Sequence, residues 1–149
     1  MTEPTFRRAT PNDLDAVLAI ARQVWDELGE SSGFTQRPSA EGLRPILHGP
    51  RSAIFLCHTP AGACGFSLLA PDLSDPNEAV MGVWLLPEAR RKGLGRQLAL
   101  IATDHARSLA YKRLRGIIPK QNEPALSFFS EIASLAQVVG QDMQYELPL

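Results

Sequence analysis

The sequence has little cysteine and no long hydrophobic run, and these two absences exclude several classes of protein. Only Cys57 and Cys64 are present, too few for a disulfide framework and without a matching Cys or His pair for zinc. We interpret both as small buried apolar side chains and expect no metal site. The longest apolar run, Ala79 to Leu86, is far shorter than the ~20 residues that span a bilayer. The first ten residues also lack the apolar core of a signal peptide, which predicts a cytoplasmic protein without a membrane partner.

The composition is otherwise that of an ordinary globular protein. Its 149 residues are 44% hydrophobic and 21% charged, which predicts a single domain over residues 1–149. The net charge of −1 is unevenly spread, because residues 81–120 carry nine Lys or Arg against two acidic residues. This asymmetry predicts an anion site in one part of the molecule. A nucleic-acid-binding protein would be basic throughout, so no nucleic-acid partner is expected.

Hydrophobic periodicity and turn residues predict an α/β fold with a mixed sheet and helices on both faces. Thr10, Pro11 and Asp13 form a helix-start pattern, and apolar residues recur every three or four positions as far as Leu28. The turn at residues 59–62 predicts a hairpin. The predicted strands are 6–9, 53–58, 64–69, 79–86, 113–118 and 136–147, the last bent near Gly140. The predicted helices are 11–28, 39–47, 94–109 and 122–132, which gives the order β-α-α-β-β-β-α-β-α-β.

The stretch from Val83 to Leu100 contains the most informative pattern. A buried strand leads into a cation-rich loop, two glycines and a helix. The first turn of a helix presents unpaired N–H groups and the positive end of the helix dipole. Gly93 and Gly95 remove side chains that would keep an anion from those groups. The stretch therefore predicts a diphosphate site, with positive charge from Arg90, Arg91, Lys92 and Arg96.

Two motifs resemble the GNAT N-acetyltransferase superfamily. The run R-R-K-G-L-G at Arg90–Gly95 resembles its R/Q-x-x-G-x-G/A signature, and V-W-L-L-P-E before it resembles the preceding strand and loop. The run N-E-P-A-L-S-F-F at Asn122–Phe129 resembles the later N-x-x-A-x-x-F-Y segment. The element order matches as well, so the resemblance covers nearly the whole chain. It implies a GNAT-like fold and an N-acetyltransferase that moves an acetyl group from acetyl-CoA directly to a primary amine in a ternary complex. The acceptor partner would be a small-molecule amine or a peptide amine.

The resemblance also implies where acetyl-CoA binds. The sheet is expected to splay between residues 79–86 and 113–118, with the pantetheine arm in the opening. The Leu85 N–H would polarise the thioester carbonyl. Main-chain N–H groups of residues 91–96 would hold the pyrophosphate, and Asn122 would contact the pantetheine arm. The implied cofactor-binding residues are Leu85, Leu86, Arg90, Arg91, Lys92, Gly93, Leu94, Gly95, Arg96, Asn122, Phe128 and Phe129.

The acceptor side is less well marked in the sequence. Asp26, Glu27 and Glu30 lie where the first helix meets a loop that shapes the substrate pocket in the family. We predict that one or more of them attracts a cationic amine; a solvated helix end is the other interpretation. Trp84 either borders the acceptor pocket or packs in the core. His105 lies on an inner helix face and is interpreted as a core residue.

The chemistry requires a neutral amine more than it requires an acid. Deprotonating an amine of pKa ~10.4 costs about 4.6 kcal/mol at pH 7, whereas releasing a thiolate of pKa ~8.5 costs about 2 kcal/mol. The family's usual acid is a tyrosine, and Phe129 occupies its place here. Tyr145 is the candidate substitute, and Tyr111 is a weaker one. Glu78 lies seven strand residues, or about 23 Å, from Leu85 and is too distant to be the base.

Three further interpretations follow from the same residues. An inactive module that binds CoA would have the same anion site and would explain Phe129. An unrelated nucleotide-binding domain would prefer ATP or NAD to CoA. A solvated basic turn would bind none of them. A homodimer through an edge strand is compatible with the family resemblance.

Overall fold

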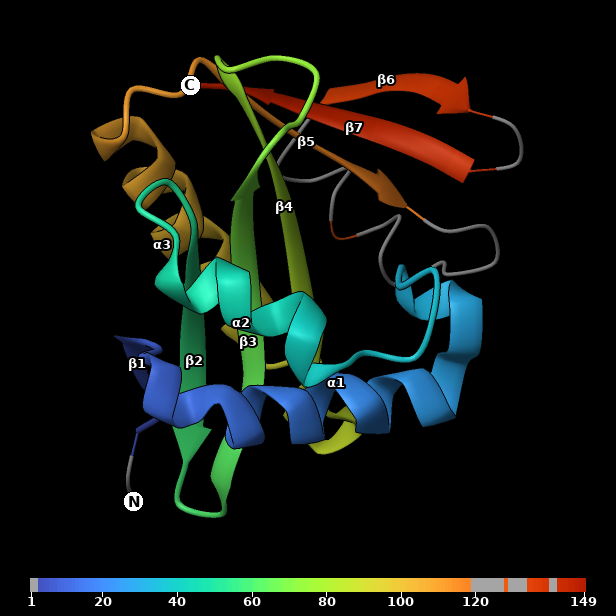
Figure 1. Cartoon of the computed structure of the whole chain (residues 1–149). Coiled ribbons are helices and arrows are strands. Elements are labelled where there is room, and N and C mark those ends of the chain that lie inside the picture. The colour runs from blue at the N-terminus through green and yellow to red at the C-terminus, as the bar shows by residue number, and fades with distance from the viewer. Residues whose placement is uncertain (1–2, 119–127, 129–133, 140–141) are drawn as a thin grey trace.

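The computed structural model describes residues 3–118, 128, 134–139 and 142–149. Its strands form one mixed sheet in the order β1-β2-β3-β4-β5-β7-β6 (Figure 1). Only β4 and β5 pair in parallel, and the other neighbours are antiparallel. The strands are β1 (Thr5–Arg8), β2 (Ala53–Thr59), β3 (Gly62–Pro71), β4 (Glu78–Leu85), β5 (Arg113–Ile118), β6 (Ser134–Val139) and β7 (Asp142–Pro148).

The helices begin where the sequence offers caps. Asp13 accepts a hydrogen bond from the Thr10 N–H at 2.7 Å, which closes the predicted helix-start pattern. Ser39 Oγ accepts one from the Gly42 N–H at 3.2 Å. The α-helices are α1 (Leu14–Leu28), α2 (Ala40–His48) and α3 (Leu94–Ser108), with short 3-10 turns η1 (Pro11–Asp13), η2 (Gly29–Ser32) and η3 (Pro87–Ala89).

Two hydrophobic clusters place helices on both faces of the sheet. Ile54 and Leu56 of β2 belong to the cluster that α1 and α2 cover, whereas Phe55 and Cys57 belong to the cluster under α3. Alternate residues of one strand point to opposite faces, so the two clusters are separated by the sheet. The predicted α/β class, with a mixed sheet and helices on both faces, is confirmed.

The C-terminal part differs from the prediction. The expected single bent strand at 136–147 is wrong, because β6 and β7 are separate strands that pair antiparallel, with Val139 opposite Asp142. Side-chain alternation is the same in one long strand and in two strands of a hairpin, so the pattern could not separate them. The helix predicted at 122–132 lies outside the described residues, apart from Phe128, which is helical.

The parallel pair β4–β5 opens along its length, as the resemblance implies. The strands pair only at Glu78–Arg113, Ala79–Leu114 and Val80–Arg115. β4 continues to Leu85 without pairing to β5, and Figure 1 shows β5 turning away from it. Beyond Val80, one edge of β4 therefore pairs with no strand in the described part of the chain. We call the paired part the closed end and the part toward Leu85 the open end.

Candidate functional site

The last residues of β4 direct main-chain groups into the opening. The Leu86 N–H donates to the Cys64 carbonyl of β3 at 2.9 Å. Successive main-chain groups of a strand point to opposite sides, so the Leu85 N–H points away from β3 and toward the opening. This is the orientation that a donor to a ligand in the opening needs. That it polarises a thioester stays a prediction. The Leu86 side chain is buried and packs on the α1 side.

The turn between β4 and α3 is shaped for an anion. Arg91 and Gly93 both adopt positive φ, 64° and 79°. Left-handed residues of this kind occur in turns whose successive N–H groups form anion-binding concavities. A Cβ added at Gly93 would meet no atom of the described residues within 4 Å, so these residues leave the space beside the start of α3 open. The first N–H groups of α3 have no acceptor within the helix and none among the other described residues, so within that part of the chain they are available to an anion.

Gly95 serves a different purpose from Gly93. A Cβ at Gly95 would lie 3.3 Å from the Leu85 side chain, 3.6 Å from Phe128 and 3.7 Å from Val83. The glycine therefore lets α3 approach β4 closely at the open end. Leu94 beside it is buried in the α3 cluster. Phe128 packs against the same cluster, while Asn122 and Phe129 lie outside the described residues and their predicted contacts stay predictions.

The four cations in the turn and at the start of α3, which we call the turn cations, fall into two groups. The side chains of Arg91, Lys92 and Arg96 are exposed and make no ion pair with any described residue. Arg90 instead binds both carboxylate oxygens of Glu27, at 2.7 and 2.8 Å, and the carbonyl of Leu85. Three cations are thus available to a ligand, and one is engaged within the protein.

The predicted acceptor side lies at the end of α1 and in η2. Asp26 pairs with Arg37 at 2.7 Å, and Glu27 pairs with Arg90. The Arg90 contact lowers the pKa of Glu27 below its ordinary value. Glu30 is exposed, and its carboxylate has no ion pair among the described residues. Of the three predicted carboxylates, Glu30 is the one most open to a cationic ligand.

Trp84 anchors the loop on this side. Its ring stacks on Phe34 at 4.7 Å between centroids and on Phe66 at 5.1 Å. Its indole N–H donates to the Ser32 carbonyl at 2.8 Å. The core interpretation of Trp84 fits these contacts, and the ring also fixes η2 beside the end of β4. Sequence reasoning missed Phe34 and Ser32, although Phe34 is the one aromatic residue in the polar segment 29–38 and could have drawn attention.

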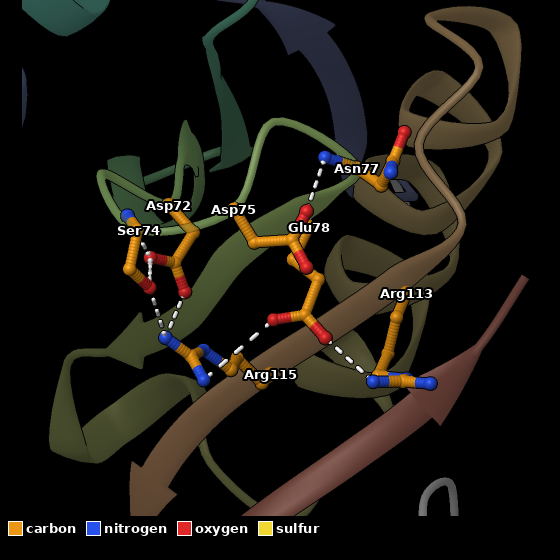
Figure 2. Close-up of polar contacts among 7 residues, drawn as sticks. All are labelled: Asp72, Ser74, Asp75, Asn77, Glu78, Arg113 and Arg115. Atoms are coloured by element: carbon orange, nitrogen blue, oxygen red, sulfur yellow. Dashed lines mark hydrogen bonds and ion pairs between the residues drawn. The ribbon is translucent and has the colours of Figure 1, made fainter.

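The closed end is held by an ionic cluster that sequence reasoning also missed (Figure 2). Glu78 pairs with Arg113 at 2.6 Å and with Arg115 at 3.6 Å. Asp72 pairs with Arg115 and accepts hydrogen bonds from the N–H and hydroxyl of Ser74 at 2.8 and 2.7 Å. The Ser74 bonds, followed by Arg115, lower the pKa of Asp72. The acidic loop before β4 and the basic start of β5 gave the only sequence signal for this cluster.

The placement of Tyr145 does not support the predicted acid role. Its side chain is buried, passes over Gly116 and donates to the Met81 carbonyl. Met81 lies four strand residues, or about 13 Å, from Leu85. Burial raises the pKa of Tyr145 far above its ordinary value. Tyr145 thus joins β7 to β4 at the point where the strands separate, and its role as the acid stays a prediction that this contact does not favour. The weaker candidate, Tyr111, donates to the Arg51 carbonyl at 2.8 Å.

Other residues singled out in the sequence have structural positions. His105 lies against Phe55, with ring centroids 5.5 Å apart, and burial lowers its pKa. Cys57 and Cys64 are free and buried, as predicted, with their sulfur atoms 3.6 Å apart. Burial raises the pKa of Cys57 to about 12. Within the described part of the chain, no helix is suited to cross a membrane, and no group of three metal-ligating side chains is found.

Comparison with known proteins identifies the fold and the family. A family model described as the acetyltransferase (GNAT) family matches residues 16–133. The chain belongs to the GNAT acetyltransferase family. It is 30% identical over 115 residues to YjgM, an uncharacterised N-acetyltransferase of Escherichia coli strain K12, with 74% of this chain and 69% of YjgM covered. The family predicted from the two sequence motifs is therefore confirmed.

Solved GNAT structures share the architecture of this chain. The PaiA N-acetyltransferase of Thermoplasma acidophilum, in complex with coenzyme A, has a TM-score of 0.82 at 18% identity, covering 99% of this chain and 100% of that one. The phosphinothricin acetyltransferase of Sinorhizobium meliloti, in complex with acetyl-CoA, has a TM-score of 0.79 at 17% identity, covering 99% and 89%. At these identities the similarity shows the GNAT fold, which confirms the predicted fold.

Proposed function

We propose that this GNAT protein transfers the acetyl group of acetyl-CoA to a primary amine, directly and within a ternary complex. The observation that carries the proposal is the β4–β5 opening, which joins the Leu85 N–H to an anion-binding turn. Support comes from the family match and from the CoA and acetyl-CoA complexes of the two similar structures. When bound, acetyl-CoA supplies a thioester-activated acetyl group.

The residues at the open end fit a ligand with linked phosphates. The N–H groups of residues 91–96 would bind the phosphate oxygens, and the space beside Gly93 is open to them. Arg91, Lys92 and Arg96 add charge that no described carboxylate neutralises. The Leu85 N–H would donate to an oxygen that gains negative charge during transfer, and such donors are worth several kcal/mol in dry sites.

On the acceptor side, Glu30 would attract the ammonium form of the amine, with Asp26 and Glu27 nearby but engaged by arginines. The amine must then lose a proton, at a cost of about 4.6 kcal/mol for a lysine-like group at pH 7. We propose that water relays this proton. A thiolate needs about 2 kcal/mol to leave unprotonated, so transfer proceeds without a tyrosine acid.

Two observations favour the alternative of an inactive CoA-binding module. Phe129 replaces the family tyrosine, and the Tyr145 hydroxyl is bound to Met81 rather than facing Leu85. The enzyme and the inactive module should both bind CoA, but only the enzyme should release thiol from acetyl-CoA in the presence of an amine. A cytoplasmic location and a homodimer through an edge strand also stay predictions.

Calorimetry and a thiol-release assay separate these possibilities. We expect heat of binding with CoA and acetyl-CoA and none with ATP or NAD at the same concentration. We expect thiol release from acetyl-CoA with at least one amine from a panel of spermidine, free amino acids, kanamycin and a lysine peptide. Binding without release on a broad amine panel would favour the inactive module. No binding of either thioester or thiol would overturn the proposal.

A further inference from the structure

Arg90 differs from the other cations of the turn because its side chain already has partners on two sides. Nη1 and Nη2 donate to the Glu27 carboxylate at 2.8 and 2.7 Å. Nε and Nη2 donate to the Leu85 carbonyl at 3.1 and 2.9 Å. These contacts use most of the five N–H donors that a guanidinium carries. Little donor capacity remains for a phosphate.

The Arg90 contacts join three elements around the opening. Glu27 lies in the last turn of α1, Leu85 ends β4, and Arg90 lies between η3 and α3. Glu27 and Arg90 are 63 positions apart in the chain. A single side chain therefore connects the acceptor side, the strand that presents the Leu85 N–H, and the anion-binding turn.

The contacts also fix the peptide between Leu85 and Leu86. Its carbonyl accepts from Arg90, while its N–H donates to Cys64 at 2.9 Å. A peptide plane held at both sides cannot rotate freely. Because Leu85 links this plane to the preceding one, the restraint also limits the direction of the Leu85 N–H.

The Arg90–Glu27 ion pair is bidentate and partly shielded from solvent, and both properties help Arg90 to restrain the peptide between Leu85 and Leu86. The side chains of Arg90 and Glu27 are 31% and 35% exposed. Two parallel N–H···O bonds between a guanidinium and a carboxylate fix orientation as well as distance. A lysine or a monodentate contact would fix distance alone.

We propose that Arg90 is a positioning residue rather than a phosphate ligand: held by Glu27, it orients the Leu85 main chain for acetyl transfer. The inference rests on the proposed acetyltransferase function. It assigns Glu27 a role in holding Arg90 instead of binding the amine. It leaves phosphate binding to the main chain of the turn and to Arg91, Lys92 and Arg96.

The test uses the charge-neutral pair Glu27→Gln with Arg90→Gln, which removes one charge of each sign and so leaves the long-range field nearly unchanged. We expect kcat for thiol release, with the fastest amine of the panel and saturating acetyl-CoA, to fall about tenfold or more. We expect the Kd for CoA by calorimetry to change less than about twofold, because no phosphate contact is lost. Weaker CoA binding by about tenfold with normal kcat would overturn the proposal.

The single variant Glu27→Gln and the NMR signal of the Leu85 amide test the positioning role independently of the double variant. Glu27→Gln alone frees the guanidinium, so it also lowers kcat if Arg90 is a positioning residue and leaves kcat unchanged if Arg90 binds phosphate. In protein labelled with ¹⁵N-leucine, the Leu85 amide signal should shift in Glu27→Gln before any ligand is added. An unmoved signal with wild-type kcat would contradict the proposal even if the double variant failed to fold.

Asp104→Asn with Arg107→Gln is the matched control, because it removes an exposed Arg–Asp pair at the far end of α3. Neither kcat, nor the CoA Kd, nor the Leu85 signal should change in it. Measurements on the wild-type protein distinguish failure of the proposed acetyltransferase function from failure of the positioning role of Arg90. If it neither binds acetyl-CoA nor releases thiol, the proposed function fails; if it does both and the Glu27 and Arg90 variants match the control, only the positioning role fails.

Discussion

The two ends of the β4–β5 pair differ in whether their polar groups have partners within the protein. At the closed end, the carboxylates of Asp72 and Glu78 bind Arg113 and Arg115, so charge of both signs is matched within the protein (Figure 2). At the open end, the first N–H groups of α3 lack helical acceptors, and three turn cations, Arg91, Lys92 and Arg96, lack ion pairs to described residues.

This difference distinguishes polar groups that stabilise the fold from polar groups that are available to a ligand. Polar groups that find partners inside the protein contribute to stability, whereas groups turned toward an opening find partners in water or in a ligand. Mutations at the closed end should therefore change the free energy of unfolding, and mutations at the open end should change CoA binding.

The largest expected effect is at Gly93. Gly93→Leu places a side chain in the open space beside the start of α3, where phosphate oxygens are proposed to lie. We expect CoA affinity, measured by calorimetry, to fall about 100-fold or more, equivalent to about 2.7 kcal/mol. The positive φ of 79° should also cost about 1–2 kcal/mol in unfolding free energy.

Gly62→Leu is the matched control for that strain. Gly62, the first residue of β3, has a φ of 118° and no described atom within 4 Å of its Cβ position. It should lose similar stability and bind CoA normally. If Gly93→Leu and Gly62→Leu bind CoA equally well, the anion site has been placed in the wrong turn.

At the closed end, Glu78→Ala should mainly lower stability. The Glu78 side chain is only 10% exposed and pairs with two arginines. Leaving both arginines without this partner should cost about 2 kcal/mol in urea unfolding, below the range for fully buried pairs because the arginines reach solvent. CoA affinity of the folded protein should change less than tenfold. If the loss in CoA-binding free energy exceeded the loss in unfolding free energy, the closed end would also serve CoA binding, contrary to this prediction.

Tyr145 lies at the boundary between the two ends. Tyr145→Phe removes the hydrogen bond to the Met81 carbonyl and keeps the ring over Gly116. We expect a loss of about 1 kcal/mol in unfolding free energy, as for a typical buried hydrogen bond. The kcat for thiol release should stay within about twofold. A loss of kcat of about 100-fold with normal stability would instead support the acid role predicted from the sequence.

Features with a local physical cause could be predicted from the sequence. The Thr10–Asp13 cap, the hairpin at 59–62 and the glycine at the start of α3 each depend on a few adjacent residues. The family motifs added the opening between β4 and β5, which local patterns alone do not show.

Contacts between distant segments could not be predicted in the same way. The Arg90–Glu27 pair, the Trp84–Ser32 bond and the Glu78–Arg113 pair join residues that are 63, 52 and 35 positions apart. Their formation depends on how elements pack, and an arginine beside phosphate-binding glycines looks the same in sequence whether it binds a ligand or a carboxylate. The Tyr145 contact could not be predicted for the same reason, because the sequence does not show that its hydroxyl donates to the Met81 carbonyl.

The smallest expected effect concerns pH at the closed end. The pKa of Asp72 is lowered mainly by the Ser74 bonds, so its folded-state pKa lies below that of the unfolded chain. The carboxylate therefore adds stability above the unfolded pKa of ~3.9, and this stability is lost as the pH falls through and below that value. In urea titrations, wild type should be more stable than Asp72→Asn at pH 6, and the difference should shrink at pH 3. Asp104→Asn, which removes an exposed carboxylate paired with Arg107, controls for the charge. If the difference in unfolding free energy stayed constant from pH 6 to pH 3, Asp72 would stabilise the closed end through its shape and not through its ionised oxygens.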